Sequence, residues 1–160
     1  MPRGGAVMEK TAIAEMTSAP PIPQVCGAAE AFAAIALAAV ACDGELSAVE
    51  ARRLRQQLES RRPFSERGEE EMAALLDRLL TVLRSQGCEA LVRQAVPQLQ
   101  PGQRQTALAV AADLTWADHV ETGTEHQFLL NLAEQLQINA ERCTQILEVI
   151  NLLNSDSLAD

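Results

Sequence analysis

Residues 31–42 read AFAAIALAAVAC and form the longest uninterrupted apolar run of the chain, with Glu30 before it and Asp43 after it. These residues are too few for a membrane-spanning helix, which needs about 20 apolar residues. The run is rich in alanine, the residue with the highest helix propensity. The stretch therefore predicts a helix in the core of a globular domain, and we expect no direct insertion into a membrane.

The same helical character continues on both sides of this run. From residue 25 onward the chain is rich in Ala, Leu, Gln, Glu and Arg, and no segment alternates as a half-buried strand does. Pro101 suits the first position of a helix, and Asn139 suits an N-cap. The pattern predicts an all-α domain of about seven helices, at 25–42, 48–60, 66–85, 88–96, 101–117, 123–136 and 140–153.

Outside these helices the sequence changes character. Residues 1–24 contain four prolines and show no hydrophobic period, which predicts a flexible leader. They also lack an apolar run next to a basic start, so we expect no secretory signal. The domain is expected to cover 25–153, and residues 154–160 to form a polar tail.

Composition excludes some functions. The 160 residues carry a net charge of −9, and only 2% are aromatic. Nucleic-acid modules present basic surfaces and aromatic stacking platforms, so we expect no nucleic-acid partner. The four cysteines, Cys26, Cys42, Cys88 and Cys143, have neither zinc-finger spacing nor the pattern of a disulfide framework. We expect buried free thiols in a reducing compartment.

A helix–acidic turn–helix pattern occurs twice, with an offset of 75 residues. Asp43 and Glu50 in the first copy correspond to Asp118 and Glu125 in the second. The recurrence predicts a pseudo-twofold repeat. Each glutamate stands three residues after a hydroxyl residue, the spacing of a capping box, so capping alone could explain both glutamates.

The aspartates stand where helices end, although the helix dipole there disfavours an anion. Either they are turn residues, or they bind a cation. Carboxylates and helix-end carbonyls are hard oxygen ligands, which Ca²⁺ and Mg²⁺ prefer. The candidate metal ligands are therefore Asp43, Glu50, Asp118 and Glu125, with Asp113, Glu121 and His119 as additional candidates.

The pattern is not an EF-hand, because the loop positions that should carry acids hold Ala39 and Ala41 in the first copy. Any metal site must therefore draw ligands from both copies. A zinc site that uses His119 is an alternative. The charges are also segregated: residues 105–141 contain no Lys or Arg, whereas five arginines lie between 52 and 62. These arginines could neutralise the acidic stretch, or the two regions could mark a cation site or a partner surface.

No nucleophile elbow, phosphate-binding loop or zinc-protease motif is present in the sequence, so we expect no enzymatic activity. Three hypotheses remain: a metal-linked interaction module, a purely structural protein–protein interaction module, and a metal-dependent enzyme.

Residues 33–47 with Glu50, and residues 107–113 through Asp118 to Glu125, resemble the TerB-like family of tellurite-resistance proteins and their relatives. The resemblance spans roughly residues 25–153. In the second copy His119 replaces the glycine that the family tends to have. The resemblance implies a cytoplasmic, non-enzymatic module of about seven helices that acts in tellurite and chemical stress. It also implies divalent-metal binding through acidic residues, and protein partners in a membrane-associated complex.

Overall fold

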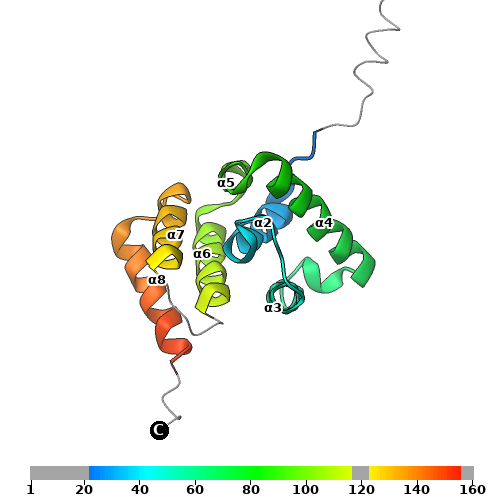
Figure 1. Ribbon diagram of the computed structural model, residues 1–160. Helices are drawn as coiled ribbons and strands as arrows, with labels where there is room; N and C mark the ends of the chain where they lie inside the picture. The colour runs from blue at the N-terminus through cyan, green and yellow to red at the C-terminus, as the bar shows by residue number, and fades with distance from the viewer. Residues whose placement is uncertain (1–21, 117–122, 156–160) are drawn as a thin grey trace, which may run out of the picture.

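The computed structural model describes residues 22–116 and 123–155, and every regular element in these ranges is helical (Figure 1). The seven α-helices are α2 (Gly27–Ala41), α3 (Ala48–Glu59), α4 (Glu69–Gln86), α5 (Cys88–Ala95), α6 (Pro101–Trp116), α7 (Gly123–Gln135) and α8 (Ala140–Leu153). Two 3-10 turns, η1 (Phe64–Glu66) and η2 (Val96–Gln98), follow α3 and α5. The predicted all-α fold is confirmed, and each predicted helix coincides with an observed one.

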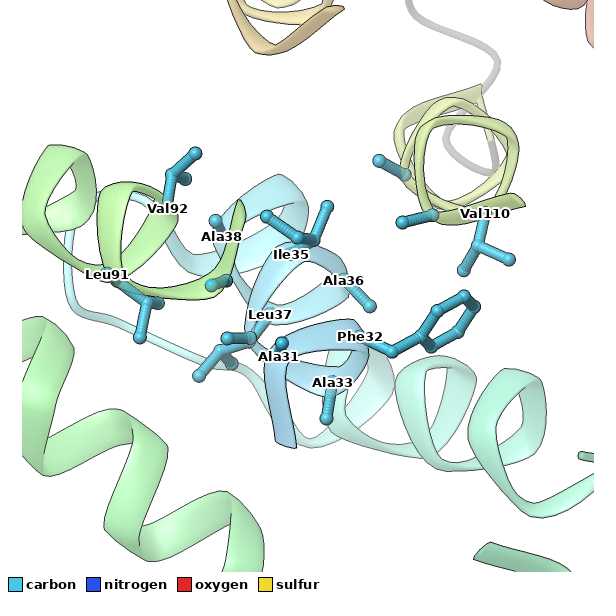
Figure 2. Packing of buried hydrophobic residues seen from close by; sticks show 14 of the residues in the cluster. Ala31, Phe32, Ala33, Ile35, Ala36, Leu37, Ala38, Leu91, Val92 and Val110 are labelled. Atoms are coloured by element: carbon cyan, nitrogen blue, oxygen red, sulfur yellow. The ribbon is translucent and has the colours of Figure 1, made fainter. Parts of the chain in front are cut away.

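Helix α2 is the centre of the core. Every residue from Ala31 to Ala38 is buried, and the side chains of Ile35 and Leu37 are fully enclosed. A helix that is apolar on all sides can be buried only if other helices surround it. Helices α5 and α6 pack most extensively against α2, and α3 and α4 complete the surroundings. Figure 2 shows Leu91 of α5 and Val110 of α6 approaching α2 from different sides.

The remaining helices bury one face each. Helix α4 places its leucine stripe in the core, as its sequence predicts, and contacts α2 and α5. Helices α7 and α8 pack on α6 and on each other, at the side of α6 away from α4 (Figure 1). No helix in the described ranges has the length and hydropathy needed to cross a membrane.

Local signals set the helix ends. Helix α6 begins at Pro101, and the side chain of Asn139 accepts a hydrogen bond of 2.8 Å from the backbone N–H of Arg142, as predicted. Gly87 ends α4 with φ +93°, a conformation that glycine adopts without steric cost. Its N–H donates to the carbonyl of Leu83 at 2.8 Å.

Glutamine side chains hold the segment before α2. Gln86 donates to the carbonyl of Pro23 at 2.7 Å, and Gln98 donates to the carbonyl of Val25 at 2.6 Å. Gln94 accepts from the N–H of Val25 at 3.1 Å, and the Val25 side chain is buried. The chain is therefore attached to the domain from Pro23 onward. The rest of the predicted leader, residues 1–21, lies outside the described residues.

The prediction of four buried free thiols is wrong for three of the cysteines. Cys42, which follows α2, forms a disulfide with Cys88, the first residue of α5, and their Cα atoms lie 5.3 Å apart. Cys26 is free but exposed, whereas Cys143 is free and buried, as predicted. Burial raises the pKa of the Cys143 thiol. The disulfide was missed because it joins residues 46 positions apart, and only the packing of α5 on α2 brings them together. The thiols thus give no support to a reducing compartment.

Candidate functional site

The first acidic turn connects α2 to α3. One carboxylate oxygen of Asp43 accepts a hydrogen bond of 3.0 Å from the N–H of Glu45. Gly44 takes φ +90°, its N–H donates to the carbonyl of Ala41 at 2.8 Å, and its carbonyl accepts from Arg84 at 3.0 Å. Asp43 therefore has the turn role that its sequence allowed, and its side chain remains exposed to solvent.

The capping box predicted at the start of α3 is present. The hydroxyl of Ser47 accepts from the N–H of Glu50 at 3.1 Å, and the carboxylate of Glu50 accepts from the N–H of Ser47 at 3.0 Å. These bonds satisfy two backbone donors at the helix start. Capping thus accounts for the position of Glu50, and a ligand role for this residue stays a prediction.

The side chain of Asp113, on α6, lies between α3 and the residue that follows α8. Its carboxylate accepts hydrogen bonds from the side-chain amide of Gln57 on α3 and, at 2.8 Å, from that of Asn154 after α8. These residues, together with Arg53, line a pocket of about 430 Å³. Asp113 therefore connects α3, α6 and the end of α8.

The second acidic segment is described only in part. Asp118, His119 and Glu121 lie outside the described residues, so their predicted ligand roles stay predictions. Glu125 lies in the first turn of α7, close to Trp116, with which it lines a small surface hollow. The indole N–H of Trp116 is buried and has no hydrogen-bond partner.

A larger pocket lies between α5, α7 and Cys42, the residue that follows α2. It measures about 630 Å³ and is lined by the Cys42–Cys88 disulfide, by Glu89 of α5, and by residues of α7 that include Phe128 and Glu134. Cys42 directly precedes Asp43, and Phe128 stands three residues after Glu125. The fold thus brings Cys42 and the part of α7 from Phe128 to Gln135 to one pocket, and none of the predicted metal ligands that the structure describes lines it. The sequence analysis did not single out Glu89 or Glu134 as site residues, because each is an isolated acid on its own helix.

Within the described ranges, no three His, Cys, Asp or Glu side chains gather closely enough to hold a metal ion by themselves. Two arginines, one in α3 and one in the segment that follows α3, pair with glutamates close to them in sequence. Arg55 contacts Glu59 at 2.9 Å, and Arg62 contacts Glu66 at 3.8 Å. The charges of these two arginines are therefore neutralised by glutamates nearby in sequence, and not by the acidic stretch at 105–141.

Comparison with known proteins agrees with this architecture. The family model for the tellurite resistance protein TerB matches residues 29–148, which is most of the chain. The chain therefore belongs to the TerB family. Searches of curated proteins and of solved structures found no significant match.

Proposed function

We propose that this chain is a non-enzymatic TerB-family module that binds a divalent cation, Ca²⁺ or Mg²⁺, and acts through a protein partner in a tellurite or chemical-stress response. The cation would be shared by the acidic turn after α2 and the acidic segment before α7. The resemblance to the TerB-like family further suggests a cytoplasmic setting and a membrane-associated complex.

The observation that supports the cation proposal is the solvent-exposed carboxylate of Asp43 in the turn after α2, where the negative end of the helix dipole disfavours an anion that no cation balances. Because no three His, Cys, Asp or Glu side chains of the described residues gather closely enough to hold a metal ion, the remaining ligands would have to come from the second copy of the acidic pattern. Asp43 would contribute a carboxylate oxygen, and Asp118 and Glu125 would contribute theirs from the second copy of the pattern. Such oxygen ligands suit Ca²⁺, which accepts carboxylate, carbonyl and water oxygens in a flexible geometry.

Exposed apolar side chains at the C-terminal end of α8 support a protein partner. Val149, Leu152 and Leu153 lie on one face of this helix and are 62%, 75% and 72% exposed. Clustered exposed apolar side chains favour a binding surface over a solvated one.

Thermal unfolding of metal-stripped protein tests the cation proposal. Ca²⁺ or Mg²⁺ should raise the stability of the wild type, by ~2.7 kcal/mol at 100 times the dissociation constant. Asp43→Asn and Asp118→Asn should each abolish this increase without lowering the stability of the metal-free protein. Asp77→Asn is the matched control, because Asp77 is an exposed acid of α4 that is not among the proposed ligands and should leave the cation effect unchanged.

If millimolar Ca²⁺ and Mg²⁺ leave the wild-type unfolding midpoint unchanged, the cation proposal fails. The second candidate, a structural interaction module without metal, would then hold. The capping box at the start of α3 and the turn after α2 favour that alternative, because Glu50 and Asp43 already have structural roles there. The partner surface has its own test. Leu152→Asp with Leu153→Asp should lower growth on tellurite, while Asn151→Asp on the same helix should not.

A further inference from the structure

Another pocket, of about 600 Å³, lies between α2, the segment that follows α3 and the start of α6. Its size falls in the range of small-molecule sites, roughly 300–1,000 Å³. Apolar surface comes from Phe32, Phe64 and Leu99, which are at most 9% exposed. The two phenylalanine rings lie 6.4 Å apart at an interplanar angle of 39°. Phe32 projects from α2 toward the side of α6 that carries Val110 (Figure 2).

The charge of this pocket is opposite to that of the whole protein. Arg61 and Arg62 line it, and no carboxylate does, although the chain has a net charge of −9. The guanidinium carbon of Arg61 lies 5.6 Å from the centroid of the Phe32 ring. Among the ion pairs of the described residues, none includes Arg61, and its Nε atom is buried without a hydrogen-bond partner. A buried guanidinium donor without a partner is costly. The terminal nitrogens of Arg61 are not buried in this way, and they can donate charge-assisted hydrogen bonds to an anion in the pocket.

The start of α6 adds to the positive potential. Gly102 and Gln103 line the pocket, and they precede the first backbone bond into this helix, which Arg104 donates to Gln100 at 2.9 Å. Helix N-termini favour anions because their first amides have no partner inside the helix. The two arginine side chains and the start of α6 thus border the same pocket.

We propose that this pocket binds a small organic carboxylate with an aromatic or alkyl body. The body would rest on Phe32, Phe64 and Leu99, and the carboxylate would pair with the guanidinium groups of Arg61 and Arg62. The proposal is independent of the cation site, because none of the proposed cation ligands within the described ranges lines this pocket.

Titration of the full chain with 2-naphthoate, followed by backbone amide NMR shifts, tests this proposal. The shifts should centre on Gly102, Gln103 and Thr106. The neutral, equally shaped 2-naphthamide should bind about tenfold more weakly or worse, because it forms no charge-assisted bond. Octanoate, titrated in the same way, distinguishes an alkyl from an aromatic body, and at least one of the two carboxylates must bind.

Two variants remove the charge complementarity in different ways. Arg61→Gln combined with Arg62→Gln should weaken 2-naphthoate about tenfold or more, while Arg52→Gln, an exposed arginine of α3 outside the pocket, should not. Gly102→Glu places a carboxylate at the pocket and should also prevent binding. The fold should tolerate this change, because a Cβ atom at Gly102 meets no atom within 4 Å and an acid suits a helix start.

Three results would overturn the proposal. The first is that neither carboxylate binds at millimolar concentration. The second is equal affinity for 2-naphthoate and 2-naphthamide, or for the wild type and the double arginine variant. The third is a set of shifts centred on the pocket beside the disulfide, at Cys88 and Val92.

Discussion

Replacing Cys42 and Cys88 together by serine should lower the free energy of unfolding by ~4 kcal/mol, because the disulfide closes a long loop. The two cysteines are 46 residues apart in sequence. In the chain-entropy treatment, a cross-link of this span lowers the conformational entropy of the unfolded chain. This raises the free energy of the unfolded state by ~4 kcal/mol at 25 °C. The packing of α2 on α5 does not depend on the sulfur atoms, so the variant should keep the native fold.

Urea unfolding at equilibrium measures this effect. The wild type without reductant should unfold at a higher urea concentration than the wild type with dithiothreitol, and the double serine variant should match the reduced protein. Cys26→Ser is the control, because Cys26 is free and exposed and its replacement should leave the midpoint unchanged. Thiol titration in denaturant should detect two free thiols per chain before reduction, those of Cys26 and Cys143, and four afterwards.

Four reactive thiols in protein that was never exposed to reductant would refute this reasoning, since Cys42 and Cys88 would then be neighbours without a covalent bond. Equal urea midpoints with and without dithiothreitol would refute the stability argument even if the bond forms. In that case the unfolded chain would already be constrained, or strain in the folded state would offset the entropy gain.

Three further changes probe the cap, the core and the buried thiol. Ser47→Ala should lower stability by ~0.5–2 kcal/mol in urea unfolding, with or without cations, whereas Glu50→Gln should change it little because glutamine also closes the box. Leu37→Ala should lower stability by ~2–5 kcal/mol, since the leucine is fully buried and its removal leaves a cavity. Cys143 should react with iodoacetamide far more slowly than Cys26, as followed by mass spectrometry, because it is buried and its raised pKa leaves less thiolate. The folded state holds this thiol proton more tightly than the unfolded chain does. The Cys143 contribution to stability should therefore decrease as the pH rises above 9.0, the ordinary pKa.

The candidate site was predictable where it depends on neighbours in sequence. The capping box of Ser47 and Glu50 and the turn at Asp43 use partners within three residues, so spacing alone identified them. The hydrogen bonds of Asp113 were not predictable in this way. Its partners, Gln57 and Asn154, are 56 and 41 residues away, and their meeting depends on how α3 and α8 cross α6.

The sequence by itself determined the helical class and, within residues 22–116 and 123–155, the number of helices and most of their ends. Helix propensity, apolar period and end signals such as Pro101 and Asn139 act over a few residues, so they can be recognised along the chain. It also determined that the apolar run at 31–42 belongs to a helix of the core, because a segment that is apolar on all sides must be surrounded.

Only the tertiary structure decided which surfaces of these helices meet. An apolar stripe marks a face for burial but does not specify its partner, and a cysteine or arginine carries no sign of what lies opposite. The approach of α5 to α2 joined Cys42 to Cys88, which spacing had indicated to be free thiols. The approach of α2 to the segment after α3 placed Arg61 beside Phe32, in a pocket without carboxylates that the start of α6 completes. Both outcomes depend on helix crossing geometry, which arises from the packing of the whole core and not from any local stretch of the chain.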